Sequence, residues 1–157
     1  MILSAKKIVK IQSPYFVPDE AFLGAIKLAL LSGVRVELMF PQKIDHYVAH
    51  FASFSYINEL LKFGLKVYHY NGFLHSKVVI VDDEIITIGT CNIDIRSFSL
   101  NFEDNIVVYD KFFANDYSKE FEKDKAVCNI YDENARKNTK FFVKIFVNFC
   151  RLFSSVL

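Results

Sequence analysis

The sequence predicts an α/β fold in which one mixed β-sheet is covered by helices on both faces. Apolar helical segments alternate with β-rich segments through the first part of the chain, which is typical of units whose strands run parallel. The second part is mainly a run of short β-rich segments. The length of 157 residues fits a single domain of ordinary size.

The first part of the chain predicts two strands and two helices. Pro14 and Pro18 mark a loop after the first strand, and Asp19 has the side chain of a helix N-cap. Gly33 and Gly64 end the two helices, since glycine adopts the left-handed conformation that closes a helix. The predicted elements are a strand at 6–12, a helix from about Asp19 to Leu31, a strand at 34–40 that Pro41 ends, and a helix at 46–64.

The second part is rich in β-branched residues, which favour strands. Polar or glycine-containing breaks separate its short runs. The predicted elements are strands at 65–70, 75–82, 84–89 and 105–110, followed by a helix from Phe112 to about Cys128.

The first residues suggest an incomplete element. ILSAKK, residues 2–7, reads as the last turn of a helix that has no start and no capping residue. Met1 would then be an internal methionine or the start of a broken reading frame. We therefore predict that the first helix is truncated and that residues 1–130 form a single domain.

The last residues, 131–157, predict an amphipathic helical tail. Apolar side chains recur at helical spacing from residue 139 onward, with polar or basic residues on the other side. The apolar members are Phe141, Phe142, Ile145, Phe146, Phe149, Leu152, Phe153 and Val156, and the others are Lys140, Lys144, Asn148 and Arg151. Charges interrupt the stretch too often for a membrane span, so the apolar side either packs on protein or lies in the headgroup region of a bilayer.

His75 and Lys77 are the first candidate functional residues. They lie two positions apart in the run LHSKVVIVD, so strand geometry would project them from one face. A cation beside the imidazole argues against a metal centre, which needs neutral or anionic ligands. The pair suits a phosphate, because the ammonium binds its oxygens and the imidazole can attack phosphorus or transfer a proton. The alternative is an ordinary strand histidine beside a surface lysine.

The residues that follow favour the phosphate site. Asp82 falls on the opposite strand face from His75, so we expect it in a scaffold role. Gly89 follows the next β-rich run and permits a tight bend, which lets Thr90 and Asn92 approach a ligand closely. Together these residues form the pattern H-x-K-x4-D-x6-G-[S/T]-x-N, and with it the sequence resembles the phospholipase D superfamily.

The resemblance covers nearly the whole chain and is strongest to the C-terminal half of bacterial cardiolipin synthases. Its segments are QSPYFVPDEAF (12–22), DH (45–46), GFLHSKVVIVDDE (72–84) and GTCNIDIRSFSLNFEDN (89–105). It implies phosphatidyl transfer between two phosphatidylglycerol molecules through a phosphohistidine, with release of glycerol and without a metal or other cofactor. His75 would protonate the departing glycerol and then deprotonate the incoming alcohol, while Lys77 and Asn92 hold the phosphoryl oxygens. Thr90, where many relatives have serine, can donate a hydrogen bond there.

The chain carries one copy of a motif that such enzymes use twice. His46, His50 and His69 have no lysine two positions later. The second histidine must come from an upstream half or from a second copy of the chain. Three interpretations therefore stay open: the C-terminal half of a cardiolipin synthase, a homodimeric phosphodiesterase or nuclease of the same superfamily, and an inactive truncated remnant.

Three flanking residues carry further expectations from the resemblance. Glu103 matches an acid that accepts a hydrogen bond from the catalytic histidine and raises its basicity, unless it is a solvated glutamate at a strand edge. Tyr15 matches a residue at the rim of the site, or packs under a loop. Arg96 either binds phosphate or pairs with Asp94 or Asp104.

Composition limits the partners and the location. The net charge of +1 gives no global basic field, which argues against nucleic acid as the partner. The odd number of cysteines (Cys91, Cys128 and Cys150) and the lack of CxxC spacing predict free thiols in a reducing compartment. With the resemblance, we expect a protein peripheral to the cytoplasmic side of the cell membrane. Its expected partners are phosphatidylglycerol or another phospholipid, the membrane surface, and the missing N-terminal half or a second copy, which would cover exposed apolar surface.

Overall fold

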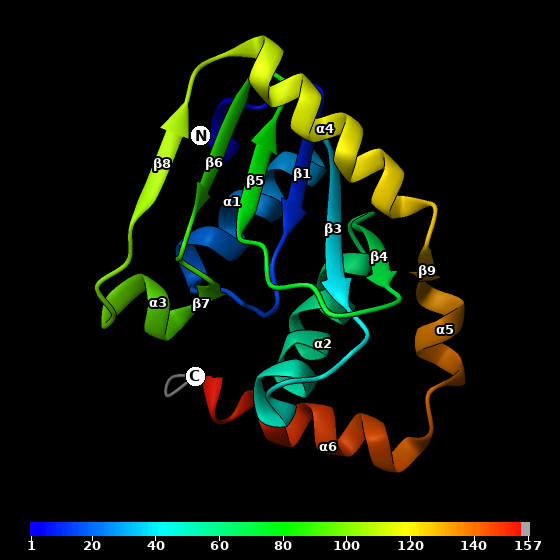
Figure 1. The fold of residues 1–157 in the computed structure, drawn as a ribbon. Helices are drawn as coiled ribbons and strands as arrows, with labels where there is room; N and C mark the ends of the chain where they lie inside the picture. Colours follow the sequence, from blue (N-terminus) through cyan, green and yellow to red (C-terminus); the bar gives the residue numbers. More distant parts are fainter. Residues whose placement is uncertain (155–157) are drawn as a thin grey trace.

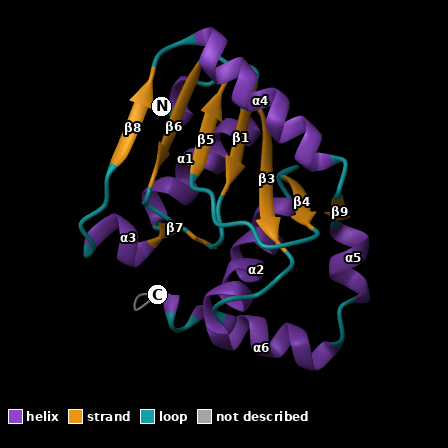
Figure 2. Cartoon of the chain, in the orientation of Figure 1, coloured by secondary structure: helices purple, strands orange, loops and turns teal. Residues whose placement is uncertain are grey.

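The computed structural model describes residues 1–154, and its central element is a seven-stranded β-sheet with the order β8-β6-β5-β1-β3-β4-β9. Three strands run parallel to one another: β1 (Ile8–Gln12), β3 (Arg35–Pro41) and β4 (Lys66–Tyr70). The others pair antiparallel with their neighbours: β5 (Val78–Val81), β6 (Ile85–Gly89), β8 (Asn105–Val108) and β9 (Cys128–Tyr131). The sheet is therefore mixed, which confirms the prediction (Figure 2).

Helices cover both faces of the sheet, as predicted. In Figure 1, α1 (Glu20–Leu31) and α2 (Tyr47–Leu61) lie behind the sheet, and α4 (Lys111–Lys125) crosses in front of it. The apolar sides of α1 and α2 share the largest buried cluster with β1, β3 and β4. On the opposite face, α4 contributes Ala114 and Phe121 to two smaller clusters. The central strands are consequently buried on both sides.

Successive side chains of β1 point alternately to the two faces of the sheet. Val9 and Ile11 belong to the cluster under α1 and α2, whereas Lys10 and Gln12 point to α4. All four side chains are buried. The amide of Gln12 donates to the carboxylate of Asp124 at 3.2 Å, which satisfies a polar group that burial removes from water.

Capping residues fix the predicted helix boundaries. The carboxylate of Asp19 accepts a hydrogen bond from the backbone N–H of Phe22 at 2.7 Å, so Asp19 is the N-cap of α1, as predicted. Gly33 and Gly64 follow α1 and α2 with φ of 83° and 97°. This left-handed conformation costs glycine little and ends both helices.

Several short elements have no signal in the sequence. They are β2 (Phe16–Val17), β7 (Ile93–Asp94), α3 (Ile95–Ser99) and β9, whereas the 3-10 turn (Ile2–Ser4) and α5 (Glu133–Asn138) fall in segments predicted to be helical. Most are too short to show a period, and β9 depends on pairing with the distant β4. The helix predicted to reach Cys128 therefore ends at Lys125, and the helical turn predicted at 2–7 is reduced to the 3-10 turn.

The predicted tail helix forms α6 (Phe141–Arg151), which packs on α2. Val147 and Cys150 are the buried side chains of α6, and the ring of Phe146 meets that of Phe51 edge-on, with centroids 5.1 Å apart. The three cysteines of the chain are free thiols, as predicted: Cys91, Cys128 and Cys150. The part of the tail at Val156 lies outside the described residues.

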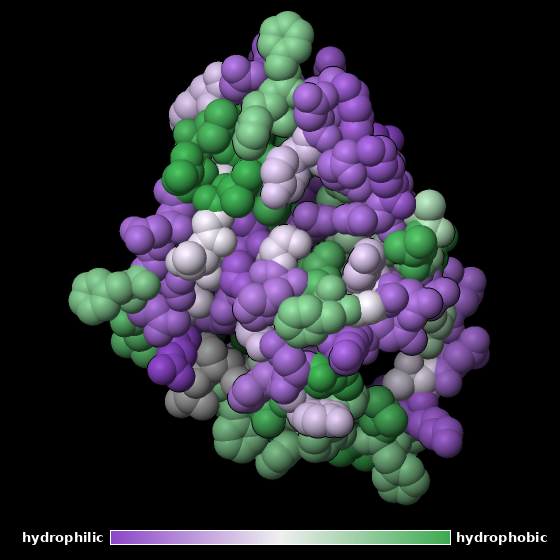
Figure 3. Space-filling view, in the orientation of Figure 1, coloured by the Kyte–Doolittle hydropathy of each residue, from purple (hydrophilic) through white to green (hydrophobic). Residues whose placement is uncertain are grey.

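The broad apolar side of α6 faces away from the domain. We call it the Phe stripe; each of its side chains is at least half exposed, and its members are Phe141, Phe142, Ile145, Phe149 and Leu152. Figure 3 shows apolar side chains gathered along the lower margin of the molecule, where α6 lies in Figure 1. Within residues 1–154, no helix is long and apolar enough to cross a bilayer.

Candidate active site

Most of the predicted site residues are carried by segments that meet at one end of the sheet. Val78, the first residue of β5, pairs with Gln12 at the end of β1 and with Ile88 near the end of β6. Because β5 runs antiparallel to both neighbours, the segment before β5 and the segment after β6 emerge at the same end. The first segment carries His75, and the second carries Thr90.

A small second sheet holds the loop after β1 against the loop after β6. Phe16 and Val17 of β2 pair in parallel with Ile93 and Asp94 of β7. The hydroxyl of Ser13 also accepts a hydrogen bond from the N–H of Ile93 at 3.3 Å. These contacts join the loop after β1 to the loop after β6, across about half of the chain.

His75 and Lys77 lie in an extended segment just before β5, which begins three residues later than predicted. The side chain of His75 is exposed, and its ring stacks on Phe73 with centroids 5.7 Å apart and an interplanar angle of 13°. The ammonium of Lys77 donates to the backbone carbonyl of His75 at 2.7 Å. The N–H of Gly89 donates to the carbonyl of Lys77 at 3.3 Å, so the segment continues the pairing of β5 with β6.

Negative charges surround Lys77. Burial lowers the pKa of its ammonium, and the nearby carboxylates of Glu103, Asp45 and Asp94 offset part of this effect. Asp45 belongs to a segment that resembles the family, and nothing in its local sequence marks it as a site residue. It reaches the site because β3 ends beside β1, so their following loops adjoin.

Asp82 does not join the other motif residues. It follows β5 at the end opposite to His75, and its carboxylate accepts hydrogen bonds from the N–H groups of Lys6, Lys7 and Ile8 at 2.8, 2.8 and 2.9 Å. Burial raises the pKa of this carboxyl, but the three donors outweigh burial, so the pKa is lowered. Asp82 thus ties the start of β1 to the β5–β6 turn and does not touch the site.

Thr90 and Glu103 are hydrogen-bonded to each other. The hydroxyl of Thr90 donates to the carboxylate of Glu103 at 2.5 Å and accepts from the N–H of Asp104 at 3.0 Å. The amide of Asn101 also donates to Glu103 at 3.0 Å. Donation from Thr90 first, and then from Asn101, lowers the pKa of Glu103. A hydrogen bond from His75 to Glu103 remains a prediction.

Gly89 makes the approach of β8 possible. A Cβ atom at this position would overlap the carbonyl oxygen of Asp104 and the side chain of Asn105. Gly89 also pairs with Asn105 in the register of β6 and β8. The glycine of the motif therefore serves close backbone contact, in addition to the tight bend that the sequence predicts.

Asn92 offers an unused polar atom. Within the described residues its amide oxygen is buried and has no hydrogen-bond partner. A buried acceptor without a donor costs about 1–3 kcal/mol. A ligand group that donates a hydrogen bond at this place would remove that cost.

Tyr15 and Arg96 occupy the flanks. The hydroxyl of Tyr15 donates to Asp45 at 2.8 Å, and burial together with this contact raises the pKa of the phenol. The guanidinium of Arg96 is exposed and donates to Asn101 at 3.2 Å. Asp94 caps α3 by accepting from the backbone N–H of Ser97 at 2.6 Å, and the described residues show no ion pair between Arg96 and either Asp94 or Asp104. A phosphate-binding role for Arg96 stays a prediction.

Comparisons with known proteins show the family. The family described as "Cardiolipin synthase, PLD-like domain" matches residues 1–125. Cardiolipin synthase 1 of Staphylococcus aureus strain MRSA252 is 46% identical over 158 residues, covering 100% of this chain and 32% of that protein. The major cardiolipin synthase ClsA of Bacillus subtilis strain 168 is 43% identical, covering 100% of this chain and 33% of that protein. The chain thus spans about a third of the length of these curated relatives.

Solved structures share the fold at lower identity. Nuc of Salmonella typhimurium, a phospholipase D family member, has a TM-score of 0.75 at 21% identity and covers 84% of this chain and 86% of that one. The phosphatidylserine synthase of Haemophilus influenzae has a TM-score of 0.74 at 19% identity and covers 99% of this chain and 43% of that one. The single-copy motif and its placement at one end of a mixed sheet agree with the family match over most of the chain. This chain belongs to the family of phospholipase D-like domains of cardiolipin synthases.

Proposed function

We propose that this chain is the C-terminal catalytic half of a cardiolipin synthase, which transfers a phosphatidyl group from one phosphatidylglycerol to another and releases glycerol. One observation carries the proposal. The segments that hold His75, Lys77, Thr90 and Asn92 emerge together at one end of the sheet, in a chain 46% identical to a named cardiolipin synthase. The exposed imidazole of His75 is open to a substrate.

The residues divide the chemistry of a double displacement. A histidine of the other half attacks phosphorus, the bond from phosphorus to the glycerol oxygen breaks, and protonated His75 gives its proton to that oxygen. In the second step the hydroxyl of another phosphatidylglycerol gives its proton to His75 and attacks phosphorus, which releases the first histidine. Lys77 stabilises the negative charge on the non-bridging oxygens.

The carboxamide of Asn92 suits two tasks. Its nitrogen can donate to a phosphoryl oxygen, whereas its buried oxygen lacks a donor within the described residues. An alcohol hydroxyl is such a donor. We propose that this oxygen becomes accessible to the glycerol hydroxyl only after a local rearrangement, because it is buried in the structure.

The half that supplies the second histidine is proposed to cover the surface beside the site. β8 is an edge strand, and large apolar side chains on it and on either side of it in the sequence are exposed. They are Leu100, Phe102, Ile106, Val107 and Tyr109. Figure 3 shows apolar side chains over this part of the molecule. Since the relatives are about three times longer than this chain, an upstream part of the polypeptide is the proposed cover.

We also propose that the tail, residues 131–157, holds the catalytic domain, residues 1–130, at the cytoplasmic face of the membrane. The Phe stripe supports this, because it points away from the domain and Lys140 stands next to it. Exposed aromatic rings beside basic side chains favour the headgroup region of a bilayer. Phosphatidylglycerol would then meet the site from the same surface.

A homodimeric phosphodiesterase is the second candidate. It is favoured by the match to Nuc, which covers 84% of this chain and 86% of that one, so the two chains are of similar length. Two copies of His75 would then share the two roles, with water as acceptor. The mass of the isolated chain in solution and its activity without added protein test this candidate: an inactive monomer rejects it.

The test of the leading proposal is His75→Ala in the complete assembly, with the upstream half present. Cardiolipin formed from phosphatidylglycerol vesicles is measured by mass spectrometry, and we expect a loss of at least about 100-fold, because general acid catalysis contributes that much or more. The thermal unfolding midpoint should not change, since the side chain is exposed. Turnover that persists in this variant would place the chemistry elsewhere.

A further inference from the structure

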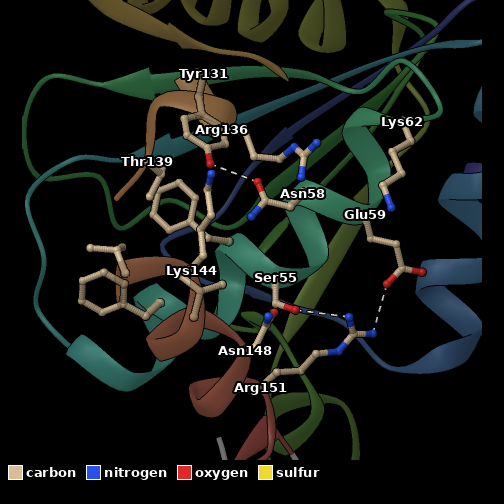
Figure 4. Close-up of a pocket in the computed structure, with 14 residues that line it drawn as sticks. Ser55, Asn58, Glu59, Lys62, Tyr131, Arg136, Thr139, Lys144, Asn148 and Arg151 are labelled. Carbon is tan, nitrogen blue, oxygen red and sulfur yellow. Dashed lines mark hydrogen bonds and ion pairs between the residues drawn. The ribbon is translucent and has the colours of Figure 1, made fainter. Parts of the chain in front are cut away.

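A cavity of about 650 Å³ lies between α2 and the α5–α6 arm, apart from the candidate active site. None of the motif residues lines it. Figure 4 shows Arg151 beside Ser55 and Glu59 at one end of it, and Tyr131 and Arg136 at the other. Its volume falls within the range of about 300–1,000 Å³ that is usual for small-molecule sites.

The lining of this cavity combines an apolar part with a basic part. Phe51, Phe54, Val143 and Val147 contribute the apolar surface. Four basic residues and a single acidic residue also line it: Lys62, Arg136, Lys144, Arg151 and Glu59. The excess of positive charge favours an anion, and the apolar side chains favour a ligand that also carries hydrocarbon.

Two of the basic groups are held by carboxylates. The guanidinium of Arg151 contacts Glu59 at 3.1 Å and lies over the ring of Tyr56, 4.4 Å from its centroid. That of Arg136 contacts Glu133 at 2.7 Å. The paired guanidiniums fix the walls of the cavity, while their charge is largely compensated by the carboxylates.

The two lysines are free to bind a ligand. Lys144 donates to the backbone carbonyl of Lys137 at 2.9 Å and has no carboxylate partner within residues 1–154. Lys62 has no ion pair in the same part of the chain, and its side chain is exposed. Each ammonium retains donors for the oxygens of a phosphate.

We propose that this cavity binds the headgroup of an anionic phospholipid at a second, non-catalytic site. Helix α6 supports the lipid assignment, because one side of it lines the cavity through Val143 and Val147 while another presents the Phe stripe. A bilayer that contacts the Phe stripe would bring its phosphates to the level of Lys144. The amide groups of Asn58 and Asn148 offer further hydrogen bonds inside.

The experiment uses dihexanoyl phosphatidylglycerol as a soluble probe with the full chain. Binding is followed by the NMR signals of the side-chain amides of Asn58 and Asn148, which line this cavity. We expect saturable shifts, and Lys62→Gln combined with Lys144→Gln should weaken binding about tenfold. The matched control is Lys6→Gln combined with Lys66→Gln, two exposed lysines outside the cavity, which should bind as the parent chain does.

Further probes separate the sources of the phosphate. Inorganic phosphate and dihexanoyl phosphatidylcholine should both bind more weakly, since the first lacks hydrocarbon and the second lacks net negative charge. Equal binding of either probe, or no effect of the Lys62 and Lys144 changes, overturns the proposal. His75→Ala should leave these amide shifts intact, so failure of the catalytic proposal and failure of the lipid site give different results.

Discussion

At the scale of single residues, two positions of the motif act on the backbone rather than on a ligand. The carboxylate of Asp82 accepts hydrogen bonds from three backbone N–H groups at the start of β1, at the end of the sheet opposite to the site. Gly89 lets β8 pass close to β6. The motif therefore combines candidate catalytic side chains with residues that hold together the strands carrying them.

Gly89→Ala should destabilise the fold and disorder the site. The added Cβ would meet the carbonyl of Asp104 and the Asn105 residue, neither of which can move without breaking the pairing of β6 with β8. We expect the free energy of unfolding to fall by about 1–3 kcal/mol in urea titrations. Gly24→Ala is the control, because a Cβ there meets nothing within 4 Å in the middle of α1. It should raise stability by about 0.5–1 kcal/mol; equal behaviour of the two variants would contradict the close approach of β8.

At the scale of elements, α4 is fixed to the sheet by a buried charge as well as by apolar packing. The ammonium of Lys10 contacts Asp83 at 3.3 Å and Glu122 at 3.0 Å, and it also bonds the hydroxyl of Ser118. Lys10 is 4% exposed, whereas both carboxylates remain partly in water. The contacts of this ammonium fix the positions of β1, α4 and the β5–β6 turn relative to one another.

Lys10→Ala should loosen α4. The change removes the partner of two carboxylates and leaves a cavity, so we expect a loss of about 3 kcal/mol of unfolding free energy. Because Asp83 and Glu122 can gain water, the loss should lie at the lower end for a broken buried pair. Lys119→Ala on the outer side of α4 serves as control, since its pair with Asp116 is exposed and should contribute little. Hydrogen exchange of the α4 amides gives the local readout, and unchanged exchange in Lys10→Ala would argue against this role.

The Phe stripe of α6 should control membrane affinity without controlling stability. Phe142 and Phe149 are 82% and 52% exposed, so their replacement by serine removes little packing within the domain. We expect the double variant to bind phosphatidylglycerol vesicles at least about tenfold more weakly in flotation assays, with an unchanged unfolding midpoint. Val147→Ser is the opposite case, since Val147 is buried and its loss should lower stability. If both variants bound vesicles as the parent chain does, the stripe would have another partner.

At the scale of the whole molecule, the largest core contains an uncharged histidine. His50 of α2 is buried, stacks on Phe40 with ring centroids 4.9 Å apart, and lies near His69. Burial lowers its pKa to about 4, with a further contribution from His69. Burial likewise lowers the pKa of His69. The core is therefore built for neutral imidazoles.

Stability should fall as the pH is lowered from about 6.5 to 4. The unfolded chain binds a proton at His50 near its usual pKa of 6.5, whereas the folded chain binds it only near pH 4. The stabilisation from a neutral His50 is thus complete above pH 6.5 and is lost by pH 4, on the order of 3 kcal/mol in all. Urea titrations across this range measure the loss. His50→Phe keeps an aromatic ring on Phe40 and should flatten the pH dependence; an equally steep profile in this variant would assign the effect to other groups.

Much of the fold could be predicted because its signals are local. The long strands and α1, α2 and α4 follow from hydrophobic period, and Asp19, Gly33 and Gly64 mark the helix ends. The same local signals predict a strand that begins at His75, whereas β5 begins at Val78. Residue spacing specifies whether a segment forms a helix or a strand. The residue at which a strand begins depends on its pairing with the neighbouring strands.

The sequence by itself predicted the mixed sheet and the amphipathic tail, and it gave the candidate residues for the chemistry. Tertiary structure alone decided that Asp82 stands apart from Thr90, that Asp45 joins the site, and that the Phe stripe of α6 turns outward while Val147 and Cys150 turn in. These outcomes depend on contacts between residues far apart in the chain, such as Ser13 with Ile93. No local period encodes such contacts, because they form only when packing brings separate elements together.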